Sequence, residues 1–245
     1  MEIKRLDFTA IQAALDAGWQ TWRETAAVST TVAAAISVIG LLIMGGLIVA
    51  GFAPFTIAAA GGFMLLGPIL LAGFFGIAAA LDAGRRPATA DFFAGFRQAS
   101  GGIWAIALVC GLLFLIFVTD AAILYSYMVG AAPVWGERLG ADLGIGRFVF
   151  WGMVSGMVIA LMLYVISAFS VPLLCDRRAG LVDAVVTSVR VVFGNLPGAV
   201  AWAFVLAVVM ISSVFMMPLL PLTLPWLAYA SRALYRRVLP PSRQA

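Results

Sequence analysis

The sequence predicts an all-α membrane protein, a polytopic helical bundle that crosses the bilayer six times. The first observation is composition: 64% of the 245 residues are hydrophobic and only 11% are charged, whereas soluble domains carry about 25% charged residues. The second is a series of long apolar runs, since one helical crossing takes about 20 residues. The third is that thirteen of the fifteen Lys and Arg residues fall in alternate gaps between these runs.

Six apolar runs follow one another along the chain, and each is continuously apolar, unlike the alternating strands of a membrane barrel. They cover residues 29–52, 55–80, 103–128, 148–175, 199–217 and 219–233. The last run is interrupted by Pro221 and Pro225. We expect one integral membrane domain, 1–245, made of an amphipathic arm (1–28), the bundle (29–238) and a tail (239–245).

The basic residues indicate the orientation of the bundle. The N-terminal arm, the second and fourth gaps between the runs and the C-terminal tail are rich in basic residues. The first and fifth gaps contain none, and the third contains only Arg138 and Arg147. Cytoplasmic loops carry the excess of Lys and Arg, so both termini are expected in the cytoplasm. The charged first 28 residues lack a cleavage site after a short apolar core, so the first run is expected to stay as a membrane helix.

Short amphipathic stretches precede the first, third and fifth runs. Each begins near an aspartate (Asp7, Asp91 or Asp183) and continues as an apolar stripe at helical spacing: Phe8, Ile11, Leu15, Trp19 and Trp22, then Phe92, Phe93 and Phe96, then Val182, Val185, Val186, Val189 and Phe193. We interpret this as a threefold repeat of interfacial helix, outward helix and inward helix, with a cytoplasmic collar of amphipathic helices. Chance similarity between short loops is the alternative. The collar makes Phe92, Phe93 and Phe96 candidate partner-facing residues.

The chain contains no histidine. Histidine-ligated haem, copper and zinc sites and histidine acid–base catalysis are therefore excluded. Cys110 and Cys175 both lie toward the cytoplasmic side and are best interpreted as packing residues. No phosphate-binding P-loop pattern is present. We expect no enzymatic activity, no cofactor and no metal.

Asp120 is the only acidic residue well inside an apolar run. A carboxylate in hydrocarbon is costly, which makes it a candidate transport or gating residue. It lies about 25 Å along the helix from Ile103, close to the far interface, and this depth favours a structural role instead.

Three arginines near the C-terminus, Arg232, Arg236 and Arg237, are candidate contacts for anionic lipid headgroups, at about 1 kcal/mol each. A simple orientation signal is the alternative. The net charge of +4 does not indicate nucleic-acid binding, because the arginines flank membrane segments and form no basic face.

Several motifs are similar to those of a known family. In the first half of the chain they are GPILLAGFF at 67–75 and DFFAGFR at 91–97. In the second half they are Ser170-Val171-Pro172-Leu173-Leu174 followed by Asp176-Arg177, then Ser188-Val189-Arg190 with Asn195, and finally Pro225-Trp226-Leu227-Ala228-Tyr229 with Tyr235-Arg236. The chain resembles bacterial six-helix integral membrane proteins that are classed as a domain of unknown function. That resemblance implies a bacterial inner-membrane location and supplies no activity. Members often carry histidines near the closing motif, where this chain has Ala228 and Ser231.

The leading hypothesis is a non-catalytic scaffold or accessory subunit of a membrane complex. The alternatives are a small-solute or ion transporter that uses Asp120 and, least favoured, a lipid-active membrane enzyme. The expected partners are the lipid bilayer and its anionic headgroups, with a membrane protein partner or a second copy of the chain left open and no nucleic acid.

Overall fold

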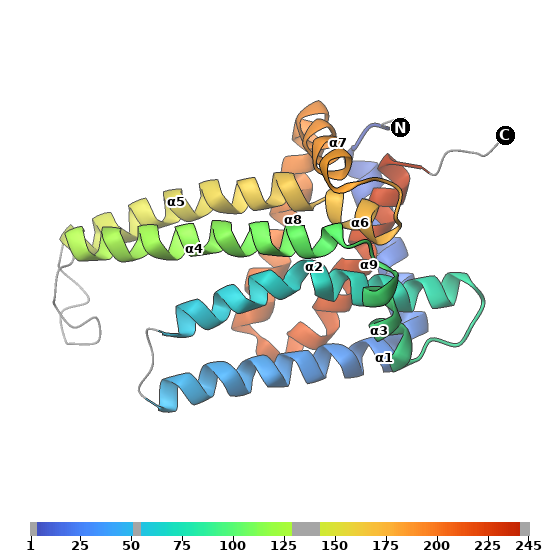
Figure 1. The fold of residues 1–245 in the computed structure, drawn as a ribbon, viewed down its shortest axis with the longest axis horizontal. Coiled ribbons are helices and arrows are strands. Elements are labelled where there is room, and N and C mark those ends of the chain that lie inside the picture. The colour runs from blue at the N-terminus through green and yellow to red at the C-terminus, as the bar shows by residue number, and fades with distance from the viewer. Residues whose placement is uncertain (1–3, 51–54, 129–142, 241–245) are drawn as a thin grey trace.

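The computed structural model describes residues 4–50, 55–128 and 143–240, and the regular elements within these ranges are all helical (Figure 1). The helices are α1 (Phe8–Val49), α2 (Phe55–Asp82), α3 (Thr89–Gln98), α4 (Gly102–Met128), α5 (Leu143–Ser167), α6 (Ser170–Cys175), α7 (Leu181–Gly194), α8 (Leu196–Phe215), the 3-10 turn η1 (Met217–Leu219) and α9 (Leu220–Val238). The all-α fold is therefore confirmed.

Four helical stretches are long and apolar enough to cross a membrane. They are Phe8–Ile43, Gly102–Tyr127, Gly146–Cys175 and Leu196–Ser213, and Gly67–Asp82 is a shorter apolar stretch among the described residues. α9 is less apolar, because three arginines occupy its C-terminal half. The structure thus supports a membrane protein with several spans, and the count of six crossings stays a prediction.

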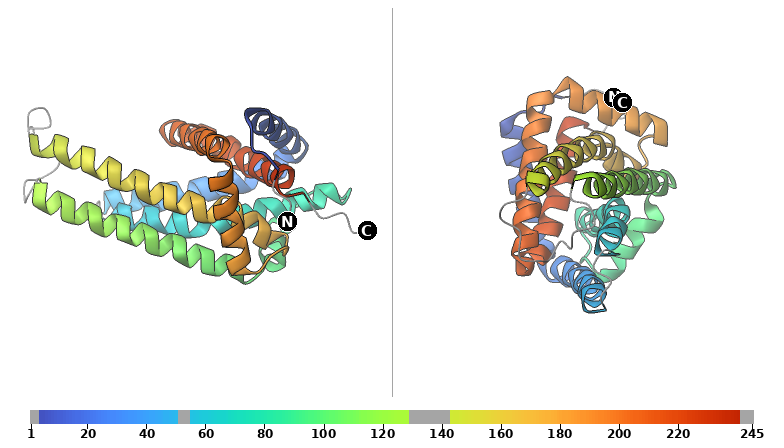
Figure 2. Two further views of the ribbon diagram at one scale, coloured as in Figure 1. Left: turned by 90° about the horizontal axis from the view of Figure 1, so that it is seen from above. Right: turned by 90° about the vertical axis from the view of Figure 1, so that its left-hand side faces the viewer.

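Two groups of helices run in different directions. α2, α4, α5 and the C-terminal half of α1 extend toward the same end of the molecule, whereas α8 and α9 run across them (Figures 1 and 2). The N-terminal half of α1 follows α9, and this pair makes the most extensive contact between helices. The helices therefore do not form one parallel six-helix bundle.

The amphipathic arm is not a separate helix, and this corrects the expected collar. α1 continues without a break from Phe8 through the first apolar run. Its stripe packs on α9: Ile11 is buried, Trp226 Nε1 donates to the Leu15 carbonyl at 3.1 Å, and Gly18 lies against the Ala230 backbone. The sequence predicts that the apolar face of the arm lies on the membrane surface. In the structure this face packs on α9 instead.

The other two amphipathic helices form where the sequence predicts them. α3 and α7 precede α4 and α8, and Asp91 and Asp183 each occupy the third helical position. Asp7 instead caps α1 from outside, since its carboxylate accepts the Ala10 N–H at 2.8 Å. Local similarity therefore links the second and third units, while the threefold repeat is not established.

The chain leaves α2 and α6 through matching turns. Arg85 N–H donates to the Ala80 carbonyl and Arg178 N–H to the Leu173 carbonyl, which is the Schellman pattern of a helix C-terminus. The left-handed residue is Gly84 in the first turn, with φ 69°, and Arg177 in the second, with φ 51°. The predicted fourth run is interrupted before this exit, at residues 168–169, so that α5 and α6 are separate helices.

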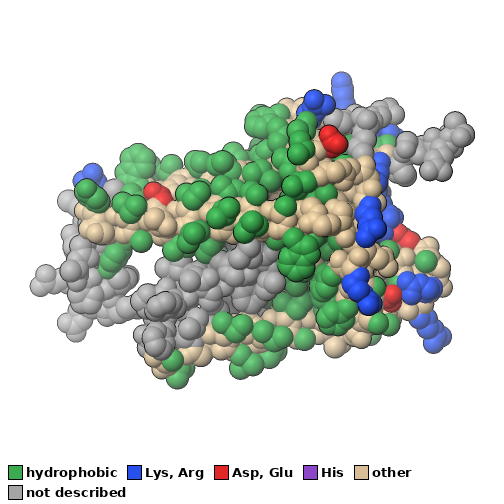
Figure 3. Space-filling view, in the orientation of Figure 1, with side chains coloured by type: hydrophobic (Ala, Val, Ile, Leu, Met, Phe, Trp, Pro, Cys, Tyr) green, Lys and Arg blue, Asp and Glu red, His purple; other side chains and the backbone are tan. Residues whose placement is uncertain are grey.

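Lys and Arg side chains gather mainly at one end of the molecule, which we call the arginine-rich end (Figure 3). The Asp82 salt bridges to Arg232 and Arg236 and the hydrogen bonds of Arg177 and Arg178 bring the C-terminal ends of α2, α3, α6 and α9 together there. The arginines on and beside these helix ends are Arg85, Arg86, Arg97, Arg177, Arg178, Arg232, Arg236 and Arg237. Fully buried side chains such as Leu174, Leu234 and Tyr235 pack beneath these arginines. By contrast, α4, α5 and α8 expose large apolar side chains along their length, as lipid-facing helices do.

Candidate functional site

Asp82, the last residue of α2, binds two arginines of α9. Its Oδ2 lies 2.9 Å from Arg232 Nη2 and 2.8 Å from Arg236 Nη1. Burial raises the pKa of Asp82, but the two guanidinium groups outweigh that effect and hold the pKa below its ordinary value. Because Arg232 is buried, this carboxylate provides the charge that its guanidinium needs in a dry environment.

The three predicted headgroup contacts have different surroundings. Arg232 is only 7% exposed and paired with Asp82, so its side chain is not available to a lipid headgroup. Arg236 is partly exposed but shares the same carboxylate. Arg237 is exposed and donates to the Ala13 carbonyl at 3.3 Å. Arg236 and Arg237 therefore remain candidate contacts for anionic lipid headgroups, whereas Arg232 does not.

Two adjacent arginines after α6 each bind the C-terminal end of another helix. Arg177 Nε donates to the Gln98 carbonyl at 2.6 Å, at the end of α3. Arg178 donates to the Leu239 and Pro240 carbonyls, just beyond α9, and to the Tyr235 hydroxyl. Cationic side chains at helix C-termini satisfy the last carbonyls and offset the helix dipole. The Asp176-Arg177-Arg178 motif thus ties α3, α6 and α9 together.

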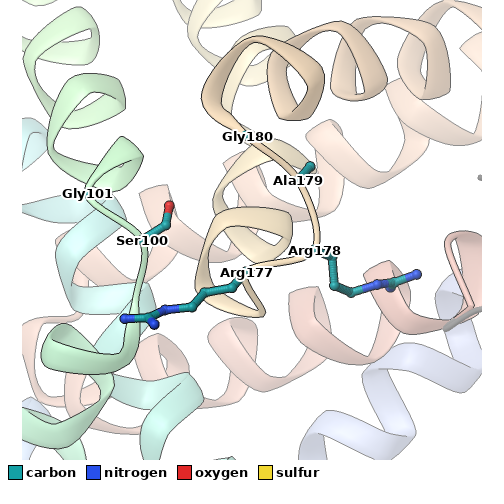
Figure 4. A pocket seen from close by; sticks show the side chains of 6 residues that line it. All are labelled: Ser100, Gly101, Arg177, Arg178, Ala179 and Gly180. Carbon is teal, nitrogen blue, oxygen red and sulfur yellow. The ribbon is translucent and has the colours of Figure 1, made fainter.

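An open pocket of about 590 Å³ lies between the turn from α3 to α4 and the turn from α6 to α7 (Figure 4). It is lined by Ser100, Gly101, Arg177, Arg178, Ala179 and Gly180. The Arg177 side chain runs toward the Ser100 segment, whereas the Arg178 side chain points away from it (Figure 4). Ser100 Oγ is buried and has no hydrogen-bond partner among the described residues.

Asp120 lies on α4 and has a polar partner on α5. Ser155 Oγ donates a hydrogen bond to Asp120 Oδ2. Close by, Gly156 lies against the Phe117 ring, so the two helices approach closely at this level. The carboxylate predicted as a transport residue therefore joins the two helices of a hairpin.

The three phenylalanines of α3 differ in burial, and the burial of Phe92 contradicts its prediction as a partner-facing residue. Phe92 is 5% exposed and packs on Gly73 and Phe74 of α2, so it belongs to the core and does not face a partner. Phe96 is partly buried against the same core. Phe93 alone of the three is exposed, at 61%.

A chain of buried hydroxyl groups between α1 and α9 was not predicted. Tyr229 OH and Ser29 Oγ lie 2.5 Å apart, Ser29 donates to Thr25 Oγ1 at 2.9 Å, and Thr25 donates to the Thr21 carbonyl at 2.9 Å. Each of these three hydroxyl groups has a hydrogen-bond partner, as buried polar groups require. The spacing of Thr25 and Ser29, one helical turn apart, is a signal that could have suggested it.

Two tryptophans near the starts of α4 and α8 have opposite surroundings. Trp104, in the first turn of α4, is 61% exposed, as an interfacial tryptophan would be. Trp202 is 2% exposed and belongs to the core. Arg138, one of the two arginines in the other gaps, lies outside the described residues.

Comparison with known families identifies a match over the middle of the chain. Residues 55–176, about half of the chain, match the family described as predicted integral membrane protein (DUF2189). No curated protein and no solved structure matches. The matched segment includes the GPILLAGFF and DFFAGFR runs and ends at Asp176, so the motifs around Ser188 and Pro225 lie beyond it. This segment of the chain therefore belongs to the DUF2189 family of predicted integral membrane proteins.

Proposed function

We propose that the protein is a non-catalytic scaffold or accessory subunit of a membrane complex. In this proposal it crosses a bacterial inner membrane six times, with both termini in the cytoplasm and the arginine-rich end at the cytoplasmic surface. The location follows the positive-inside rule and the family resemblance. The absence of histidine from the sequence supports a non-catalytic role.

The observation that carries the proposal is the way α3 presents Phe93. Gly76 and Gly95 bring the backbones of α2 and α3 into direct contact, and Phe92 fills the space beside them. The helix is held rigidly, yet the Phe93 ring is 61% exposed, with Arg97 one turn away. Aromatic residues, phenylalanine included, and arginine are enriched at protein–protein interfaces, and a preorganised side chain loses less entropy on binding.

Transport is the weaker candidate. Its main support was Asp120, and that carboxylate accepts a hydrogen bond from Ser155 on the neighbouring helix. Interhelical hydrogen bonds of this kind stabilise membrane helix pairs. We therefore assign Asp120 to the packing of α4 on α5.

The experiment compares two exposed phenylalanines at matched substitutions. Phe93→Asp should weaken binding of a stoichiometric protein partner by about 30-fold or more, since a buried interface aromatic contributes about 2 kcal/mol or more. Phe8→Asp is the control, because Phe8 is 72% exposed at the start of α1. Native mass spectrometry of the gently extracted protein measures the partner.

The result that supports the proposal is loss of the partner from Phe93→Asp alone, with both variants inserted and equally stable. If the wild-type protein carries no protein partner, or if both variants retain it, the scaffold proposal through α3 is wrong.

A further inference from the structure

We propose that one side of α7 inserts into the bilayer surface, at the boundary between the lipid headgroups and the acyl chains. Four apolar residues at spacings of four, three and four make up this side, and we call them the α7 stripe: Val182, Val186, Val189 and Phe193. The occupant of the stripe is lipid. This inference concerns a different surface from Phe93 and does not rest on the scaffold role.

α7 has a second apolar side, which packs on the protein. Ala184 is buried there, and Val185, which the sequence places in the same amphipathic stretch as the stripe, packs against the same core. Ser188 Oγ accepts the Phe169 N–H at 3.2 Å and donates to the Val165 carbonyl at 2.7 Å. These bonds join α7 to the break between α5 and α6, so the helix is held in place by the protein itself.

The α7 stripe lies away from this core and is exposed among the described residues. Val182 is 72% exposed, Phe193 is 65% exposed and Val186 is 40% exposed. Residues three and four positions apart are neighbours on a helix, so these side chains form one continuous apolar surface. Asp183 and Arg190, seven positions apart, share a different, exposed side. A helix with separate apolar and charged sides is typical of elements that lie in the interface plane of a membrane.

The direction of α7 suits a helix on the membrane surface. α7 contacts α5 and leads directly into α8, and both neighbours belong to the stretches that are long and apolar enough to cross a membrane. In both views of Figure 2 α7 runs across α5, and in the right-hand view α8 runs down from the end of α7. Because α7 crosses both neighbours, it lies along the membrane surface whichever of them is closer to the membrane normal.

Lipid is the occupant because the stripe continues an apolar surface that faces lipid. Leu196 and Val200, in the first two turns of α8, are half exposed and follow Phe193 at spacings of three and four. α8 is a candidate membrane span, whose exposed apolar side chains meet acyl chains in a bilayer. Figure 3 shows hydrophobic side chains that gather over α7 and continue over α5. One bilayer therefore covers both surfaces.

The charges of α7 indicate which property of the lipid matters. Asp183 and Arg190 are the charged residues of this helix, and their charges cancel. The helix therefore gains nothing from attraction to an anionic surface, and its insertion depends on buried apolar area. This separates the α7 stripe from Arg236 and Arg237, whose predicted partners are anionic headgroups.

The test places single spin labels on α7 of the full-length protein in phosphatidylcholine bilayers. Val182→Cys and Phe193→Cys report on the stripe, while Asp183→Cys and Arg190→Cys are matched controls on the charged side of the same helix. Collisions are measured with molecular oxygen, which concentrates in the bilayer, and with a water-soluble nickel chelate, which the bilayer excludes. The ratio of oxygen to nickel collisions should be several-fold higher for both stripe labels than for both controls.

A second arm adds phosphatidylglycerol to the bilayers, and the ratio for the stripe labels should stay unchanged. The chain without an introduced cysteine is treated in the same way and gives the background from Cys110 and Cys175. All four labelled positions are exposed, so no substitution removes a core side chain, and each side of the helix has two positions in case one variant is lost.

Three results would overturn the proposal. Equal access of the nickel chelate to stripe and control labels would place the stripe in water. Low access of both probes to the stripe labels would mean that protein covers it. A high ratio that requires phosphatidylglycerol would make charge, and not apolar area, the cause of insertion.

Discussion

At the scale of single residues, Asp82 is the carboxylate that pairs with the buried arginine of the arginine-rich end. It is the acceptor for both Arg232 and Arg236, and Arg232 Nε is a further buried donor without a partner among the described residues. Loss of the carboxylate would leave a buried guanidinium unpaired. Breaking a buried charge pair costs more than the pair itself contributes, because the remaining charge stays in a dry environment.

Asp82→Asn should therefore lower the free energy of unfolding by about 1–2 kcal/mol at neutral pH, a value reduced because the Asp82 side chain itself is partly exposed to water. The corresponding fall in melting temperature is about 3–6 °C. Since the folded-state pKa lies below its ordinary value, this stabilisation is present above the unfolded pKa of about 3.9 and is lost as the pH falls through the folded pKa. Thermal melts at pH 7 and pH 3 measure both effects.

The matched control for this prediction is Asp16→Asn, which removes an exposed aspartate of α1. Its melting temperature should equal that of the wild-type protein at both pH values. An Asp82→Asn variant that is as stable as wild type at pH 7, or a difference that persists unchanged at pH 3, would contradict the assigned role of this carboxylate.

Residue-scale contacts are also where sequence reasoning falls short. The arginines were recognised as a group, but burial of Arg232 depends on α2 and α9 meeting across 150 residues of chain. Likewise, Tyr229 finds Ser29 and Thr25 only because α9 lies along α1. A pattern of charges and hydroxyls in one segment does not reveal the partner segment, and burial is decided by that partner.

At the scale of helices, the sequence predicts where elements form better than what they pack against. The amphipathic stripes correctly predict α3, α7 and the start of α1, because helical spacing of apolar residues is a local property. The surface that each stripe meets is not local. The α1 stripe meets α9 and Phe92 meets α2, although a membrane surface would have satisfied the same pattern.

The turns after α2 and α6 illustrate the same limit. Each contains an aspartate, a glycine and two arginines, in the order Asp82-Ala83-Gly84-Arg85-Arg86 and Asp176-Arg177-Arg178-Ala179-Gly180. Aligning the aspartates pairs Asp82 with Asp176, whereas the hydrogen bonds pair Gly84 with Arg177 and hence Asp82 with Cys175, one residue away. Arg177 adopts the left-handed conformation that usually favours glycine, and its bond to the end of α3 is a reason for a side chain there.

The contact of α2 with α3 gives a prediction at this scale. A Cβ on Gly76 would lie 2.3 Å from the Asp91 carbonyl oxygen and 2.8 Å from the Gly95 backbone, which cannot move without shifting α3. Gly76→Ala should destabilise the protein by about 1–3 kcal/mol through overpacking. Gly46→Ala is the control, because a Cβ there meets nothing within 4 Å, and alanine stabilises a helix by about 1 kcal/mol over glycine.

Thermal melts of both variants in one detergent decide the matter, with a fall for Gly76→Ala and no fall for Gly46→Ala. Equal melting temperatures for the two variants would show that α3 does not dock on α2 as described.

At the scale of the whole molecule, packing and membrane contact are separated along the chain. The arginine-rich end holds a core of fully buried side chains from α6, α7 and α9, while α4 and α5 extend away from it with apolar side chains exposed. The charge pattern predicted one basic side of the membrane, and the arginines do gather at one end (Figure 3). The sequence could not show that α8 and α9 run across α4 and α5, because periodicity contains no information on crossing angles.

The number of membrane crossings can be measured with cysteines introduced one at a time. If the chain crosses six times, Arg138→Cys lies outside the cell, while Arg86→Cys and Ser242→Cys lie inside, as the positive-inside rule requires. If only the four long apolar stretches cross, α2 does not, and positions 86 and 138 exchange sides while the tail stays inside. A membrane-impermeant maleimide on intact cells should therefore label Arg138→Cys and reach the other two only after permeabilisation. The wild-type chain, whose Cys110 is buried and Cys175 partly buried, is the blank. Labelling of Arg86→Cys in intact cells would exclude the six-crossing topology and, with it, the proposed placement of the arginine-rich end at the cytoplasmic surface.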